Sequence, residues 1–287
     1  MTSAVLRYPK LFLSLVKFEH TIFALPFAYI GAFLAVDGVP SAADLLWITV
    51  AMVGARSLAM ALNRLIDAGI DARNPRTAAR ELPRGALTPW QVGFFCLASL
   101  AIFLLAVYQL APIVRWLWPI PVAAFVVYPY LKRATWLSHF WLGAVDGLAP
   151  VGAWAAITND LPLEAWLLGA AVALWVAGFD VFYALFDLEH DRAHGLHSLP
   201  ARFGVPAAFA VARACHAATV AFLVLAGLAL EVGALYWVGV AAVAGLLLYE
   251  HSVVSPRDTT RLDMAFFTMN GVISLTFFAF VLADVVV

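Results

Sequence analysis

The sequence has few charged residues. Only 12% of its 287 residues are Asp, Glu, Lys or Arg, about half of the roughly 25% found in a typical soluble domain. Hydrophobic residues make up 64% and occur in long runs. This composition excludes an ordinary soluble domain and predicts an all-α polytopic protein within a lipid bilayer, because helices satisfy their backbone hydrogen bonds internally. We expect no nucleic-acid partner.

Other features are also scarce or missing. The two cysteines, Cys96 and Cys215, lie inside apolar runs, and we interpret them as packing residues rather than a disulfide or metal pair. There is no Gly-x-x-x-x-Gly-Lys loop and no zinc-type histidine spacing, which excludes a P-loop enzyme and a zinc hydrolase. No Gly/Ser-rich linker divides the chain, so we treat residues 1–287 as one domain.

Nine apolar runs are long enough to cross a bilayer, which takes about 20 residues in a helix. Three prolines, Pro119, Pro121 and Pro129, interrupt the fourth run, but membrane helices tolerate proline where neighbouring groups re-satisfy the backbone. We therefore predict nine transmembrane helices, approximately at 11–36, 43–63, 88–111, 113–131, 136–157, 163–187, 206–230, 232–251 and 264–286.

Charges of opposite sign alternate between the connections. In one set of connections Arg115 is the only basic residue. Cytoplasmic loops of membrane proteins carry an excess of Lys and Arg. We therefore expect a multi-pass protein of a prokaryotic inner or plasma membrane, with the N-terminus in the cytoplasm and the C-terminus outside. The basic residues on the cytoplasmic side are Arg7, Lys10, Arg73, Arg76, Arg80, Arg84, Lys132, Arg133, Arg192, Arg202, Arg257 and Arg261.

A first polar segment, NRLIDAGIDARNPRTAAREL, ends the second apolar run. Its Asn63, Asp67 and Asp71 are spaced four residues apart, so a helix that continues past the run aligns them on one face. Arg56 lies seven residues before Asn63 and joins the same face deeper in the membrane. We name this set the first motif.

A second polar segment, GFDVFYALFDLEHD, ends the sixth run and forms the second motif. The spacing of its four polar residues predicts another helical stripe. Each motif contains an acidic pair, Asp67/Asp71 in the first and Asp187/Asp191 in the second. Each pair ends the second span of a four-span set, and the pairs are 120 residues apart. We therefore predict an internal duplication, spans 1–4 and 5–8, with a ninth span appended. The stripe consists of Asp180, Tyr183, Asp187 and Asp191.

Two acidic stripes near lipid require neutralisation. Helix capping and pairing with nearby arginines is one interpretation. The other is metal binding, because Mg²⁺ binds one or two carboxylates together with water and substrate phosphates. Nearby Arg and Lys would then bind the remaining phosphate oxygens of a diphosphate. Two such stripes on one side of the membrane favour the metal site.

These segments resemble the UbiA superfamily of intramembrane prenyltransferases. NRLIDAGIDARNPRTAARELPRG resembles that family's first Asp-rich motif, DVFYALFDLEHDRAHGLHSLPARFG its second, and YPYLKRATWLSHFWLG its Tyr-Pro…Lys-Arg-x-Thr segment. The resemblance covers essentially the whole chain. It implies an enzyme that transfers a polyprenyl group from polyprenyl diphosphate to an aromatic acid, within a central cavity that opens to the cytoplasmic side.

The resemblance also implies roles for individual residues. Tyr183 would orient diphosphate or metal ligands, and Asp180 joins the substrate-binding set. Cations would stabilise the charge on the leaving diphosphate: Arg56, Lys132, Arg133 and Arg192. Mg²⁺ would be held by four carboxylates with Asn63 assisting: Asp67, Asp71, Asp187 and Asp191.

Departures from the family pattern leave the acceptor open. Arg64 stands where many relatives have Asp, which removes one possible metal ligand. The segment Lys17–His20 replaces the Lys-Pro-Ile-Gly common in the 4-hydroxybenzoate enzymes of ubiquinone synthesis. KFEHTIFALPFAYIGAFLA instead resembles a branch with members that serve the futalosine route to menaquinone, whose acceptor is 1,4-dihydroxy-6-naphthoate.

Ionisable residues inside the spans are candidates for acceptor binding, since such residues are usually functional. They are Lys17, Glu19, His20, His139 and Asp146.

Two other functions compete with polyprenyl transfer to an aromatic acid. One is an ion-coupled transporter with acidic stripes at a pseudo-repeat, and the other is a prenyltransferase acting on haem, a chlorophyll precursor or a sugar lipid. The motifs lie at span ends rather than at the midplane, which favours the enzyme.

Overall fold

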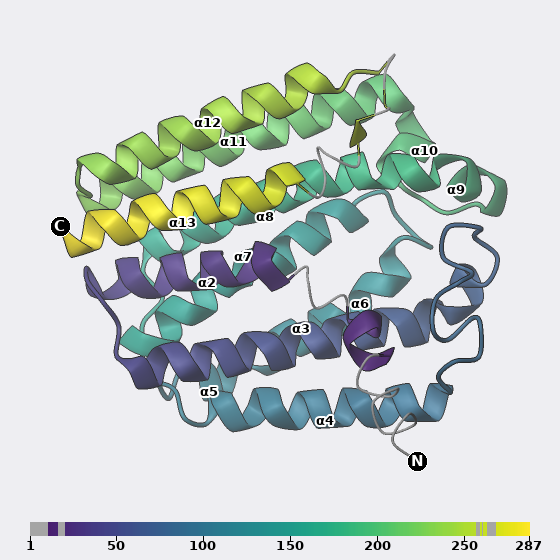
Figure 1. Cartoon of the computed structure of the whole chain (residues 1–287), viewed down its shortest axis with the longest axis horizontal. Helices are drawn as coiled ribbons and strands as arrows, with labels where there is room; N and C mark the ends of the chain where they lie inside the picture. Colours follow the sequence, from purple (N-terminus) through teal and green to yellow (C-terminus); the bar gives the residue numbers. More distant parts are fainter. Residues whose placement is uncertain (1–10, 17–20, 257–258, 260, 263–267) are drawn as a thin grey trace.

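The computed structural model describes residues 11–16, 21–256, 259, 261–262 and 268–287. Lys17, Glu19 and His20 lie outside the described residues, so their predicted role in acceptor binding stays a prediction. The regular structure is helical, and long helices run along a common direction (Figure 1). The elements are α2 (Thr21–Val36), α3 (Ala42–Asp71), α4 (Pro89–Val107), α5 (Val114–Leu117), α6 (Pro119–Leu131), α7 (Ser138–Thr158), α8 (Leu163–Tyr183), η2 (Ala184–Asp187), α9 (Leu188–His194), α10 (Leu199–Phe203), α11 (Val205–Leu230), α12 (Ala234–Val253) and α13 (Asn270–Val286).

The apolar helices agree with the predicted runs. Two shorter ones, Leu25–Val36 and Asn270–Val286, lie within the first and the ninth predicted run but are below span length in the described residues. Among the described residues, 7 helical segments are long and apolar enough to cross a membrane, and α5 and α6 together form one of them. The protein is therefore an all-helical, multi-pass membrane protein. The 7 segments are Ala42–Asp71, Pro89–Val107, Val114–Leu131, Ser138–Thr158, Leu163–His194, Val205–Leu230 and Ala234–Val253.

Helix α3 is unusually long for a single span. Ser41 caps its start by accepting a hydrogen bond from the Asp44 backbone N–H. Its 30 residues extend about 45 Å at 1.5 Å per residue, whereas the hydrocarbon core of a bilayer is about 30 Å thick. The last turns of α3, which contain Asp67 and Asp71, therefore have room to project beyond the hydrocarbon.

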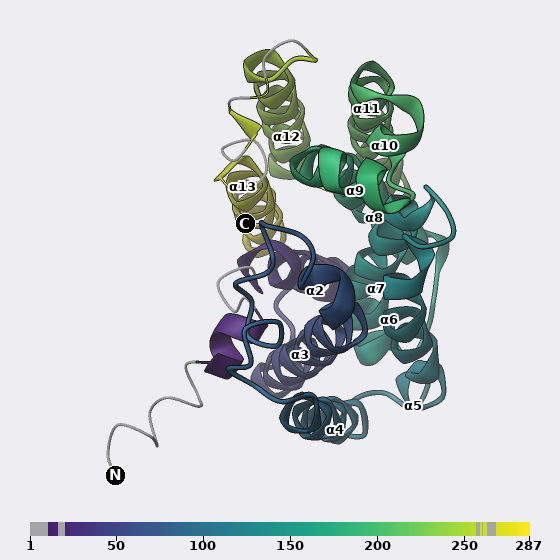
Figure 2. The ribbon, with the colours of Figure 1, turned by 90° about the vertical axis from the view of Figure 1, so that its right-hand side faces the viewer.

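Helix α8 lies between α7 on one side and α11 on the other, as the view along the helices shows (Figure 2). Glycines allow α7 and α8 to approach backbone to backbone. A Cβ on Gly143 would lie 2.0 Å from the Ala173 carbonyl oxygen, and one on Gly147 would lie 2.4 Å from that of Gly169. Asp146 is on this same α7 segment and lines a cavity on the side of α3.

The pairing of helices resembles what an internal duplication requires. α3 packs along α4, and α8 packs along α11. These are the second and third spans of the two predicted four-span sets. The duplication itself stays a prediction.

Candidate active site

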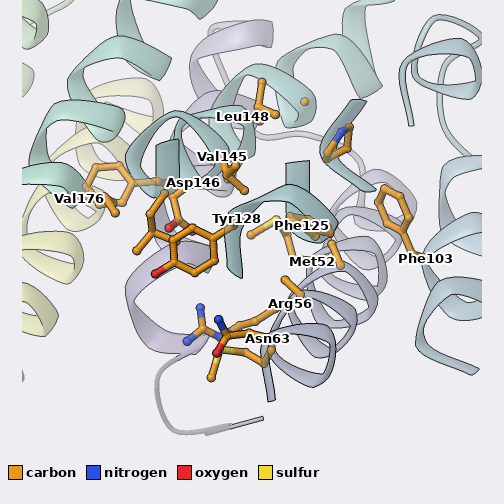
Figure 3. A pocket seen from close by; sticks show the side chains of 18 of the residues that line it. Met52, Arg56, Asn63, Phe103, Phe125, Tyr128, Val145, Asp146, Leu148 and Val176 are labelled. Atoms are coloured by element: carbon orange, nitrogen blue, oxygen red, sulfur yellow. The ribbon is translucent and has the colours of Figure 1, made fainter. Parts of the chain in front are cut away.

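A cavity of about 950 Å³ lies among α3, α6, α7 and α8. Toward the two motifs its lining is polar and includes Asn63, Arg76 and Tyr183. Toward the opposite end of the bundle it is lined by apolar side chains such as Phe103 and Trp166. Figure 3 shows the middle of the cavity, where Arg56 and Asn63 point from α3 toward Tyr128 and Asp146.

The first motif is helical to its end, as the four-residue spacing predicts, because α3 continues to Asp71. Asp67 is only 1% exposed and is surrounded by donors. The Asn63 side-chain amide donates to its Oδ2 at 3.3 Å, and Lys132 Nζ lies 2.5 Å from the same oxygen. Arg133 Nη2 donates to Oδ1 at 3.0 Å. Two of the predicted cations therefore pair with this carboxylate.

The loop at 72–88 folds back over the end of α3. Arg80 donates from Nη1 to both oxygens of Asp71, at 2.7 and 2.8 Å. The Thr77 hydroxyl donates to the Asp71 carbonyl at 3.0 Å, which holds the loop against the helix end. Asp71 is 4% exposed, so this second carboxylate of the motif is also buried against a cation.

The second motif departs from the predicted α-helical stripe. α8 ends at Tyr183, residues Ala184–Asp187 form a 3₁₀ turn, and α9 begins at Leu188. The prediction of one continuous α-helical face was therefore wrong beyond Tyr183. A 3₁₀ turn advances by three residues rather than 3.6, so it changes the direction of Asp187 relative to Asp180. Asp191 is buried, one turn into α9.

Arg76 joins the two motifs. Its Nε donates to Asp187 Oδ1 at 2.8 Å, its Nη2 contacts Oδ2, and its Nη1 donates to the Tyr183 hydroxyl at 2.6 Å. Asn74 donates to the same Asp187 oxygen at 2.8 Å. Burial lowers the pKa of Arg76, but the hydrogen bond and charge of Asp187 outweigh it and raise this pKa above its usual value. Arg76 is therefore a permanent cation that brings the loop after α3 onto the second motif.

The cavity itself contains an unpaired cation. Arg56 lines it, and its Nε is buried without a hydrogen-bond partner among the described residues. Asp146 also lines the cavity and attracts Arg56 electrostatically. Asp146 makes no hydrogen bond within the described part of the chain, so both groups remain available to a molecule in the cavity.

The structure places His139 and Arg192 elsewhere than the sequence predicts. His139 does not line the cavity as predicted; it lies behind Asp180, with Nδ1 2.7 Å from Asp180 Oδ2. Arg192 is exposed on α9 and makes no ion pair with the motif carboxylates within the described ranges. Asp180 and Tyr183 both line the cavity.

Sequence reasoning missed several site residues. The sequence motif indicates Arg64 only as the loss of a metal ligand, but Arg64 is a cavity-lining cation, 5% exposed, whose Nε donates to the Leu15 carbonyl at 3.4 Å. The basic run ARNPRTAAR contained the signal for the loop residues, but their partners could not be assigned. The other missed residues are Asn74, Arg76, Arg80 and Tyr128.

Known proteins have sequences similar to this chain. The model of the UbiA prenyltransferase family matches residues 24–272. A 4-hydroxybenzoate octaprenyltransferase from Aliivibrio fischeri (strain MJ11) is 32% identical over 248 residues, 86% of each chain. One from Ralstonia nicotianae is 31% identical, over 81% of this chain and 80% of that protein.

Solved structures agree as well. The apo structure of a UbiA homolog from Aeropyrum pernix K1 has a TM-score of 0.83 and 35% identity, and the match covers 93% of this chain and 98% of that one. A UbiA homolog from Archaeoglobus fulgidus bound to GPP and Mg²⁺ shares the fold, with a TM-score of 0.72 and 18% identity over 96% of this chain and 99% of that one. The resemblance noted in the motifs is thus confirmed: the chain belongs to the UbiA prenyltransferase family and is a membrane-embedded prenyltransferase.

Proposed function

We propose that this enzyme transfers a polyprenyl group from a polyprenyl diphosphate to a hydroxylated aromatic acid and releases diphosphate. The acceptor is a 4-hydroxybenzoate-type acid or 1,4-dihydroxy-6-naphthoate, in ubiquinone or menaquinone synthesis. The observation that carries the proposal is a cavity whose polar end is lined by Arg76 and Arg80, the ion-pair partners of carboxylates in two acidic motifs, and whose other end is apolar. Relatives named as 4-hydroxybenzoate octaprenyltransferases support the acceptor class.

The motif carboxylates behind the polar lining of the cavity suit Mg²⁺. They form two pairs, Asp67/Asp71 and Asp187/Asp191, and all donors are hard oxygens. No three acidic, His or Cys side chains of the described ranges form a metal-binding group by themselves. This fits an ion that takes one or two carboxylates and completes its shell with substrate phosphates. Bound Mg²⁺ would neutralise charge on the departing diphosphate. The A. fulgidus homolog with GPP and Mg²⁺, and its Cd²⁺ complex, support a divalent metal.

Cations that pair with these carboxylates are the proposed diphosphate ligands. Lys132, Arg133, Arg80 and Arg76 each lie within 3.0 Å of a motif carboxylate. With the carboxylates holding a metal ion, these side chains would be free to donate to the phosphate oxygens of the substrate. Arg–phosphate and Lys–phosphate hydrogen bonds are among the strongest in proteins because both partners are charged.

The acceptor is proposed to bind beside Arg56. A planar guanidinium suits a carboxylate, and its unsatisfied Nε gives it capacity for one. Asp180, Asp146 and Tyr128 line the same part of the cavity and offer partners for the ring hydroxyl. In the reaction, a ring carbon bonds to the prenyl C1, the C1–O bond breaks with its electron pair leaving on diphosphate, and the ring then loses a proton. The apolar walls keep water from the allylic cation.

The proposed topology follows from the helices and the charges. The 7 long segments and the two shorter apolar helices support nine spans, which we propose form one domain. The Arg- and Lys-rich loops gather at the motif end of the bundle, and the C-terminus lies at the opposite end (Figure 1). The positive-inside rule therefore favours a cavity that opens to the cytoplasm in a prokaryotic inner or plasma membrane.

A direct assay tests this proposal. Purified protein in detergent is incubated with labelled geranyl diphosphate and either 4-hydroxybenzoate, 1,4-dihydroxy-6-naphthoate or 1,4-dihydroxy-2-naphthoate, with Mg²⁺ or with excess EDTA. We expect prenylated product from at least one of the first two acceptors, complete loss of product with EDTA, and recovery on adding Mg²⁺. The proposal fails if no acceptor is prenylated with Mg²⁺, or if EDTA has no effect.

The apolar end of the cavity is expected to limit prenyl chain length. Gly152 lines the cavity, and a Cβ added there meets nothing within 4 Å. Gly152→Phe should therefore fill part of the tail space, so that long polyprenyl diphosphates lose activity while geranyl diphosphate still reacts. Product length, measured by mass spectrometry across a chain-length series, checks this. Gly93→Phe is the matched control, because Gly93 also has open space around it but does not line the cavity. An unchanged length limit in Gly152→Phe would contradict the tail assignment.

A further inference from the structure

We propose that His139 is a positioning residue for the acceptor, which acts through Asp180 and does not touch the substrate. The inference rests on the proposed function, because it assigns the ring hydroxyl of the acceptor to Asp180. Sequence reasoning placed His139 in the cavity wall; the structure places it one layer behind.

The hydrogen bonds of His139 determine which ring nitrogen carries the proton. The Leu199 backbone N–H donates to Nε2 at 3.2 Å. A backbone N–H can only donate, so Nε2 must be the unprotonated nitrogen of a neutral ring. The proton of the neutral ring is then on Nδ1, which donates to Asp180 Oδ2 at 2.7 Å.

This arrangement leaves Asp180 with one oxygen engaged and one available. Oδ2 accepts from His139, whereas Oδ1 has no hydrogen-bond partner within the described part of the chain, and the residue lines the cavity. A carboxylate only accepts hydrogen bonds. The available oxygen therefore selects a donor, and on an aromatic acid whose carboxylate is bound elsewhere that donor is the ring hydroxyl.

Asp180 and Arg56 are placed to hold the acceptor at two points. Asp146 interacts electrostatically with both, so the three charged groups share one region of the cavity. Arg56 would bind the acid group and Asp180 the hydroxyl, which fixes the ring relative to the prenyl C1. The ring hydroxyl would donate its hydrogen bond to Asp180, which raises the electron density on the phenolic oxygen and so stabilises the positive charge that the ring acquires when it attacks.

The hydrogen bonds of His139 connect three elements and hold Asp180 in place. It is 5% exposed at the start of α7, Asp180 is on α8, and Leu199 begins α10. A purely structural role is the competing explanation, since losing the imidazole also leaves the buried Leu199 N–H without an acceptor. The test must therefore separate loss of positioning from loss of stability.

Glutamine and leucine at position 139 provide that separation. His139→Gln retains a donor for Asp180 and an acceptor for the Leu199 N–H, whereas His139→Leu retains neither. With geranyl diphosphate, Mg²⁺ and 4-hydroxybenzoate, we expect His139→Leu to lose about tenfold in kcat/KM for the acceptor, in the range of orienting residues that lie behind a ligand. The KM for geranyl diphosphate should stay within about twofold, and His139→Gln should restore most of the activity.

A double-mutant cycle with Asp180→Asn makes the test specific. If His139 acts through Asp180, His139→Leu should cause no further loss in the Asp180→Asn background; if it acts independently, the two losses multiply. Thermal unfolding of each variant measures the structural component. A His139→Leu enzyme that equals the wild type, or multiplying losses, would overturn the inference, as would failure of glutamine to rescue. A wild type that prenylates no acceptor is a separate result, which contradicts the proposed function itself.

Discussion

Asp67→Asn is expected to lower kcat/KM by about a thousandfold, with the fold retained. Asn has nearly the same shape as Asp but carries no charge, so the proposed metal–diphosphate site would lose one anionic ligand. Deleting one group that stabilises transition-state charge typically costs 10²- to 10³-fold. Asp67 also accepts from Asn63, Lys132 and Arg133, so its removal leaves two cations without their shared partner. No other carboxylate of the first motif pairs with so many donors in the described residues.

The measurement is steady-state prenyl transfer at saturating Mg²⁺, together with thermal unfolding of the detergent-purified variant. Asp44→Asn is the matched control, because Asp44 lies in the first turn of the same helix, at its opposite end, and its side chain hydrogen-bonds only with Ser41 among the described residues. It should retain wild-type turnover. Asp191→Asn should repeat the Asp67→Asn result from the second motif. Retained activity in both Asp67→Asn and Asp191→Asn would contradict the metal assignment.

The first motif was predictable from sequence because its geometry is local. Four-residue spacing on a continuing helix aligns Asn63, Asp67 and Asp71 whatever the rest of the fold does, and α3 is continuous to Asp71. The second motif was not, because its 3₁₀ turn ends on Asp187, which is held by Asn74 and Arg76 from a loop more than 100 residues earlier. Spacing contains no information about such partners.

The contrast between local geometry and partners distant in sequence also explains why the sequence alone did not predict the positions of His139 and Arg64. A polar residue in an apolar span indicates that a partner exists, but it does not indicate whether that partner is a substrate or another side chain. His139 faces Asp180 and the amide that starts α10, neither of which is near it in sequence. The sequence motif indicates that Arg64 replaces a metal ligand, yet the helix places Arg64 in the cavity wall with Arg80 and Arg84. The departure from the usual motif therefore adds positive charge where a diphosphate would bind.

Arg56→Gln is expected to raise the KM for 4-hydroxybenzoate by about 10- to 100-fold, the value of a hydrogen bond to a charged group. The KM for the prenyl diphosphate should change little. Arg56 is seven residues before Asn63 on the same face of α3 and, unlike the motif carboxylates, it lines the cavity. Its buried Nε has no partner in the described structure, so glutamine removes a charge without breaking a hydrogen bond of the fold.

The substrate offers the sharpest control for this prediction. Phenol has the ring hydroxyl but no carboxylate, so it should react poorly with the wild type and equally poorly with Arg56→Gln. The loss caused by Arg56→Gln should then appear only with 4-hydroxybenzoate, which is the signature of a direct arginine–carboxylate contact. Equal losses with both acceptors would mean that Arg56 acts on the prenyl diphosphate instead. In that case the cation belongs to the diphosphate site, and the acceptor carboxylate must be recognised by another part of the cavity.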